Sequence, residues 1–92
     1  MSSSWRCSSF DCSGALSPVE QTICGNAVLA GLDQQVATHY GRLAAVLTGA
    51  ERQGLVSDQR QWLARRNRCR GDANCLISRY GERLSGLAAM QQ

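Results

Sequence analysis

The five cysteines are the residues of this 92-residue chain whose type and spacing point most directly to chemistry. Cys12 and Cys24 form one closely spaced pair. Cys69 and Cys75 form another, and neither pair has the Cys-x2-Cys or His-x3-His spacing of a zinc site. The spacing therefore predicts two local disulfides and no metal site. Cys7 is left over, and it is a free thiol, an intermolecular partner or a competitor for Cys12.

The two predicted disulfides bear on both stability and location. On the chain-entropy model the longer loop contributes about 3 kcal/mol and the shorter loop about 2 kcal/mol. Together these values are comparable with the whole stability of a small domain. Because disulfides persist in oxidising compartments, we expect a periplasmic or secreted protein. The first nine residues lack the apolar centre of a signal peptide, so either a signal has been removed or the protein is not exported.

The remaining titratable residues do not form a catalytic set. His39 is the single histidine, and no cysteine or serine near it in sequence marks a nucleophile. The acidic residues are scattered: Glu20 and Asp72 are placed to cap helices, whereas Asp33 and Asp58 are expected to face solvent or an arginine. No glycine-rich phosphate loop occurs. We predict a protein that is not an enzyme and that needs no cofactor.

All ten basic residues are arginines, and the net charge is +3. Guanidinium groups suit carboxylates and phosphates, although a GC-rich coding bias explains the same composition. Half of the arginines lie between residues 60 and 70. Within this run, the candidate partner-binding side chains are Arg60, Arg65, Arg68 and Arg70. The alternative is an ordinary solvated face. Arg66 is expected to be structural, bonding helix-end carbonyls or the turn near Cys75.

Helices must position these groups, since no segment shows the alternating pattern of a strand. The segment Ser17-Pro18-Val19-Glu20 predicts a capping box and a short helix. That helix should end near Cys24, with Gly25 in a left-handed conformation. A second helix should follow Asn26, with Gly31 and Gly41 permitting close approach of a neighbour. Its apolar residues recur at steps of three and four: Leu29, Leu32, Val36, Tyr40, Leu43 and Leu47.

A third helix is predicted from about residue 50 to 67 and a fourth from 73 to about 89. Trp62 should lie in the core together with Leu55 and Leu63. The fourth helix should bury the following residues: Leu76, Ile77, Tyr80, Leu84 and Leu87. A bond between the cysteines flanking residues 70–74 would clip these two helices at their corner. Trp62, Arg66 and Tyr80 are therefore the predicted structural residues.

The expected fold class is all-α: a small disulfide-stapled helical bundle with one short and three longer helices. We predict a single helical domain over residues 10–92, preceded by a flexible tail over residues 1–9. A chain this short has a thin core, so covalent bonds matter to its stability. No apolar run approaches the roughly 18 residues of a membrane span.

Several segments resemble the LprI-type lysozyme-inhibitor family of small, secreted or lipid-anchored bacterial helical proteins. They are, in order, FDC, SPVEQTIC, LAGLDQQVATHYGRL and QRQWLARRNRC, followed by a second cysteine and a helix with Tyr80. The resemblance covers residues 10–87 and implies that the cysteines pair locally. The family often carries an aspartate where this chain has Asn67, so an ion pair with Arg66 is lost. Cys7 also lies outside the family's pattern.

The resemblance implies a protein that binds a lysozyme-like peptidoglycan hydrolase and covers its cleft. A guanidinium group can occupy the paired carboxylates of such a cleft. Because many lysozymes are basic, a basic inhibitor gains no long-range attraction. The inhibitory surface is either the arginine run over residues 60–70 or one of two loops, Gly25-Asn26 and Thr48-Gly49-Ala50.

Two other classes of function stay open. One is a non-inhibitory structural or scaffolding domain of the bacterial envelope, which would copurify with an envelope protein and bind no lysozyme. The other is an arginine-mediated nucleic-acid binder, whose affinity would fall steeply with salt. Disulfides and the lack of stacking aromatics beside the arginines disfavour the second class. The expected partner is therefore a protein, with no nucleic acid and no membrane span.

Overall fold

The computed structural model describes residues 12–14 and 16–90 of the chain. The predicted tail over residues 1–9, including Cys7, lies outside the described residues. The described part forms four α-helices and no strand. They are α1 (Pro18–Cys24), α2 (Ala27–Val46), α3 (Gly49–Asn67) and α4 (Ala73–Met90). The predicted all-α fold, with one short and three longer helices, is confirmed.

Side-chain caps explain where α1 and α2 begin. The Ser17 hydroxyl accepts a hydrogen bond from the Glu20 backbone N–H at 3.2 Å, and the Glu20 carboxylate accepts one from the Ser17 N–H at 2.9 Å. Asn26 Oδ1 accepts from the first N–H groups of α2 at 3.0 and 3.1 Å. These bonds satisfy donors that the first turn of a helix leaves free. The capping box read from the sequence is therefore present.

The prediction of a left-handed Gly25 is wrong. Its φ angle is −87°, in the right-handed region. The chain continues with turn-type bonds instead: the Gly25 N–H donates to the Gln21 carbonyl at 3.0 Å, and the Asn26 N–H donates to the Ile23 carbonyl at 3.3 Å. The N-cap of α2, Asn26, follows directly, so the chain passes from α1 to α2 without a residue in the left-handed conformation.

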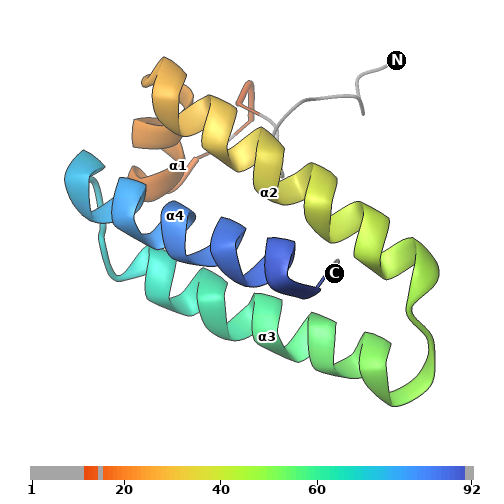
Figure 1. The fold of residues 1–92 in the computed structure, drawn as a ribbon. Coiled ribbons are helices and arrows are strands. Elements are labelled where there is room, and N and C mark those ends of the chain that lie inside the picture. Colours follow the sequence, from red (N-terminus) through yellow and green to blue (C-terminus); the bar gives the residue numbers. More distant parts are fainter. Residues whose placement is uncertain (1–11, 15, 91–92) are drawn as a thin grey trace.

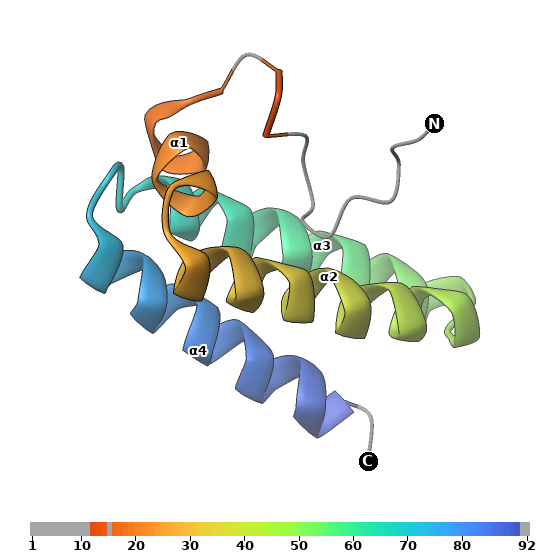
Figure 2. The same ribbon diagram turned by 90° about the horizontal axis from the view of Figure 1, so that it is seen from above.

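The three long helices lie side by side, with α3 antiparallel to α2 and α4 (Figure 1). α4 packs most extensively on α2 and also contacts α3. The short α1 contacts α2 and lies at the end where α2 begins, α3 ends and α4 begins (Figures 1 and 2). None of the described helices combines the length and apolarity that crossing a bilayer requires.

The core is built from the predicted apolar stripes. Its central contact is an edge-to-face pair of Trp62 and Tyr80, whose ring centroids are 5.0 Å apart. Around this pair lie buried apolar side chains of all four helices: Val19, Ile23, Leu29, Val36, Leu43, Leu55, Leu76 and Leu87. Ile77 is 40% exposed, so its predicted burial is wrong. It lies about 100° around the helix from Leu76, outside the face that contacts α2 and α3.

The expectation that Gly31 and Gly41 bring a neighbouring helix close is also wrong. A Cβ added at either glycine would meet no atom within 4 Å among those considered. Their absent side chains therefore create no close packing, and they only weaken α2.

Both predicted disulfides are present. Cys12–Cys24 joins the segment before α1 to the last residue of that helix, with a Cα–Cα distance of 5.9 Å. Cys69–Cys75 joins the turn after α3 to the first turn of α4, with a Cα–Cα distance of 5.5 Å. The two bonds therefore brace the end of the molecule at which α1 lies.

Candidate functional site

A chain of polar side chains runs through the core between α2, α3 and α4. Tyr80 Oη donates to Asp33 Oδ1 at 2.7 Å, and Arg66 Nη1 donates to Tyr80 Oη at 3.4 Å. Arg66 also donates from Nε and Nη2 to Asn67 Oδ1, at 3.2 and 2.9 Å. Asp33 is only 1% exposed, so of its two expected surroundings, solvent or an arginine, the first is wrong. Asp33 shares the buried face of α2 with Leu29, and the tyrosine hydroxyl compensates its burial.

Burial and the adjacent Asp33 carboxylate raise the pKa of Tyr80 well above its usual range, and nearby Arg66 opposes the rise. The hydroxyl therefore stays protonated and remains a donor at neutral pH. The Arg66 guanidinium also lies 6.0 Å from the centre of the Trp62 ring. Arg66 thus joins the core to Asn67 at the end of α3. The amide oxygen of Asn67 accepts both of these hydrogen bonds from the Arg66 guanidinium.

A second set of polar contacts joins α3 to α4. Trp62 Nε1 donates to the Arg79 carbonyl at 2.8 Å, and Arg83 Nε donates to Gln59 Oε1 at 2.9 Å. Burial lowers the pKa of Arg83, and nearby Asp58 partly offsets this effect. Arg83 is 8% exposed, and its Nη2 has no hydrogen-bond partner within the described residues. The sequence analysis missed this buried arginine, because nothing in the polar pattern around it signals burial.

The turn between α3 and α4, residues 68–72, is here called the clipped corner. Successive turn bonds hold its backbone: the Cys69 N–H donates to the Arg66 carbonyl at 3.0 Å, and the Asp72 N–H donates to the Cys69 carbonyl at 3.1 Å. Asp72 Oδ1 accepts from the first N–H groups of α4 at 3.0 and 3.3 Å, the predicted cap. The disulfide to Cys75 closes the turn. The corner is therefore rigid although it is a surface turn.

α1 also holds the clipped corner. Thr22 Oγ1 lies 3.3 Å from the Gly71 carbonyl and 3.1 Å from the Pro18 carbonyl, and its one proton is shared between these two acceptors. A Cβ at Gly71 would come within 3.2 Å of the same hydroxyl, so glycine permits this approach. A hollow of about 380 Å³ lies beside this contact, lined by Ser17, Pro18, Val19, Asn67 and Arg70. The corner thus presents an exposed arginine next to a shallow, partly apolar depression.

Arg70 has an unusual backbone conformation. Its φ angle is +56°, and it is the one non-glycine residue with positive φ in the described part of the chain. The left-handed region is disfavoured for residues with a Cβ and open to glycine. Arg68 and Arg70 are both exposed, and neither guanidinium bonds to another group within the described residues.

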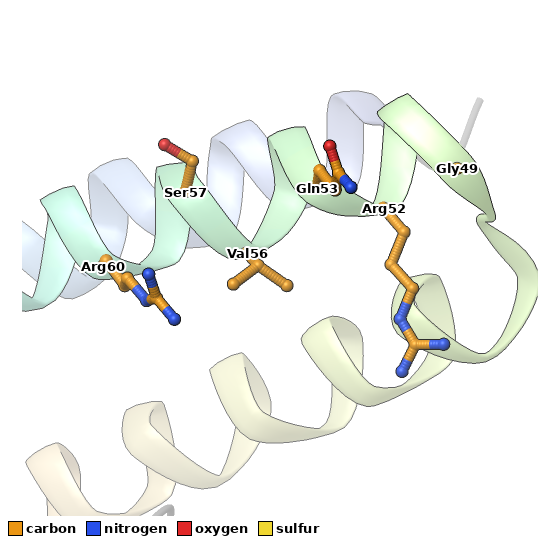
Figure 3. A pocket seen from close by; sticks show the side chains of 6 residues that line it. All are labelled: Gly49, Arg52, Gln53, Val56, Ser57 and Arg60. Atoms are coloured by element: carbon orange, nitrogen blue, oxygen red, sulfur yellow. The ribbon is translucent and has the colours of Figure 1, made fainter.

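A separate groove of about 500 Å³ runs along α3. Arg52, Val56 and Arg60 project from α3 into the space beside α2 (Figure 3). Gly49, Gln53 and Ser57 complete its lining. Gly49 belongs to one of the predicted alternative loops, and its φ of +59° is the left-handed conformation that glycine allows. This groove is therefore concave and bears two positive charges.

The structure distributes the four predicted partner-binding arginines over different faces. Arg60 lines the groove along α3, whereas Arg65 lies close enough to Arg83 to lower its pKa. These two positions are about 140° apart around the helix. Arg68 and Arg70 are together in the clipped corner. Arg65 lies three residues before Arg68, so these two also occupy neighbouring positions at the end of α3. A binding role for any of the four stays a prediction.

The structure also bears on metal binding. Within residues 12–14 and 16–90 no three histidine, cysteine or acidic side chains lie together as metal ligands would. His39 lies half-buried on α2, and it has a further contact of its own. The features left for recognition of a partner are therefore the clipped corner and the groove along α3.

Comparison with known proteins matches the chain to a protein family. The family described as Lysozyme inhibitor LprI matches residues 12–88, which include all of α1, α2 and α3 and nearly all of α4. No curated protein and no solved structure matches the chain significantly.

Proposed function

Because the chain belongs to the LprI lysozyme-inhibitor family, we propose that it binds a lysozyme-like peptidoglycan hydrolase and blocks its cleft. The family match over residues 12–88 is the observation that carries this proposal. The protein then acts outside the cytosol, in the periplasm or after secretion, where its two disulfides persist. On this proposal it is a binding protein and not an enzyme.

The braced end of the molecule supports this proposal. An inhibitor that binds without chemistry needs a surface with little freedom to lose, because ordering side chains and loops on binding weakens affinity. The clipped corner has such a surface, with one disulfide, a side-chain cap and a contact from α1. Its exposed guanidinium groups suit the acidic residues of a glycoside hydrolase cleft.

A wall-lysis assay tests the proposal. The oxidised full-length protein is mixed with c-, g- and i-type lysozymes, and the clearing of a suspension of bacterial walls is followed by turbidity. We expect slower lysis with at least one type, saturating as the inhibitor exceeds the enzyme. Unchanged lysis by every type at a large molar excess would reject the inhibitor function. An envelope scaffold predicts that second result.

A further inference from the structure

The inhibitor function leaves open which surface meets the enzyme, and the clipped corner and the groove along α3 are two candidates that carry exposed arginines. We infer that the clipped corner is the inhibitory element, with Arg68 and Arg70 placed against the two catalytic carboxylates of the hydrolase. This inference rests on the proposed function and adds the contact surface and the chemistry of its target. The groove along α3 is the competing surface.

Shape favours the clipped corner. The turn forms the edge of the molecule where α3 ends and α4 begins (Figures 1 and 2), and residues 70–72 are all exposed. A cleft that holds a polysaccharide is concave, so a projecting turn can enter it. The surface along α3 is itself hollow, with a volume of about 500 Å³. Two concave surfaces cannot exclude water from each other.

The spacing of the charges leads to the same choice. Catalytic carboxyl groups of glycoside hydrolases lie about 5–9.5 Å apart, depending on mechanism. Arg68 and Arg70 are two residues apart, so their Cα atoms are separated by at most about 7 Å. Arg52 and Arg60 are eight helical residues apart, which is about 12 Å along the axis of α3. The corner pair therefore starts from backbone positions at about the separation of a carboxylate pair, whereas the long side chains of the groove pair would have to converge to reach it.

The two corner arginines are also free to bind. Neither guanidinium has a partner among the described residues, and the nearby Asp72 carboxylate is engaged in capping α4. No acidic side chain of the corner therefore competes for them.

The conformation of Arg70 is a fourth, independent observation. Helices commonly end with glycine in the left-handed position, since glycine adopts it without steric cost. In this chain the left-handed residue of the turn is Arg70, two residues beyond the C-cap Arg68, with a φ of +56°, although the next residue is Gly71. A turn needed only to connect two helices would place glycine at residue 70. A guanidinium kept there at a cost in folding stability indicates a use for the side chain.

This conformation gives an experiment that separates binding from folding. Arg70→Gly removes the guanidinium and also relieves the steric cost, so its melting temperature should equal or exceed that of the wild type. Its inhibition constant should rise about 10- to 100-fold, the loss expected for a charge-assisted contact. Arg68→Gln should weaken inhibition in the same direction. Arg60→Gln is the matched control, because it removes one positive charge from the groove, and its inhibition constant should change less than about threefold.

The outcomes separate the proposed inhibitor function from the proposed contact surface. If the wild-type protein inhibits no lysozyme, the proposed function fails and the assignment of its surface fails with it. If the wild type inhibits and Arg70→Gly inhibits equally well, the corner assignment is overturned and the proposed function stands. A loss of inhibition in Arg60→Gln alone would transfer the site to the groove. A loss in Arg70→Gly with an unchanged melting temperature would support the corner.

Discussion

Replacing Tyr80 with phenylalanine tests whether the buried polar chain holds the helices together. The change deletes one oxygen, which donates to Asp33 Oδ1 at 2.7 Å and accepts from Arg66 Nη1 at 3.4 Å. The phenyl ring keeps the edge-to-face contact with Trp62, so the hydrophobic core loses little. The variant therefore isolates the hydroxyl.

The size of the effect follows from the charges involved. A hydrogen bond to a charged group contributes about 1.5–3 kcal/mol, because a buried charge that loses its partner is not rehydrated. Asp33 and Arg66 each keep further contacts, so neither group is left alone. We expect Tyr80→Phe to lower the free energy of unfolding by about 2 kcal/mol. For a domain of this length, that corresponds to a fall in melting temperature of roughly 8–16 °C.

Circular dichroism of the oxidised protein measures this change by thermal and denaturant unfolding. The matched control is Tyr40→Phe, since Tyr40 is also packed on the core and its hydroxyl has no hydrogen bond within the described residues. The control should change the free energy of unfolding by less than about 0.5 kcal/mol. Equal melting temperatures for the two variants would refute the argument, because the buried hydroxyl would then contribute no more than a half-exposed one.

Three further predictions concern alkaline pH, the glycines of α2 and the corner disulfide. Burial raises the pKa of Tyr80, so the stability contributed by its protonated hydroxyl is complete below the unfolded-state pKa of about 10 and is lost as the pH rises further. Denaturant titrations from pH 8 to 11 should show this loss of stability. The same titrations of Tyr80→Phe should show a smaller loss. Gly31→Ala and Gly41→Ala should each raise the free energy of unfolding by up to about 1 kcal/mol, measured in the same way, because the new methyl groups meet no atom within 4 Å. Replacing Cys69 and Cys75 together by serine should lower it by about 2 kcal/mol, and an unchanged value would show that the corner is held without its disulfide.

Local sequence signals were sufficient for the helices and the disulfides. The Ser17 and Asn26 caps act within three residues of themselves, so their geometry can be inferred without knowing the fold. The two disulfides span 12 and 6 residues, so both are local in sequence, although the sequence also left Cys7 as a competitor for Cys12. The apolar stripes similarly predict which face of each helix is buried, without knowledge of the element that packs against it.

The polar interior could not be inferred in this way. Asp33 and Tyr80 are 47 residues apart, and only the packing of α4 against α2 brings them together. Arg83 becomes buried for the same reason, through its bond to Gln59 of α3. A charged residue on a helix face gives the same sequence signal whether water or a partner from another helix lies opposite. The left-handed conformation of Arg70 was missed because the sequence offers Gly71 as the more favourable residue.

Arg66 bonds both to the buried polar chain of the core and to Asn67 beside the clipped corner. Its guanidinium bonds to Tyr80 in the core and to Asn67, which lines the hollow beside Arg70. Loss of the Tyr80 hydroxyl leaves both bonds from Arg66 to Asn67 in place, so the clipped corner should keep its shape while the core loses stability. Tyr80→Phe should therefore inhibit lysozyme as well as the wild type does at temperatures where it is folded, whereas Arg70→Gly should be stable but inhibit more weakly. Inhibition by both variants, measured at 15 °C, well below the expected melting transition, tests these two predictions. If Tyr80→Phe loses inhibition there while its circular dichroism spectrum is unchanged, the buried polar chain positions the corner as well as stabilising the fold.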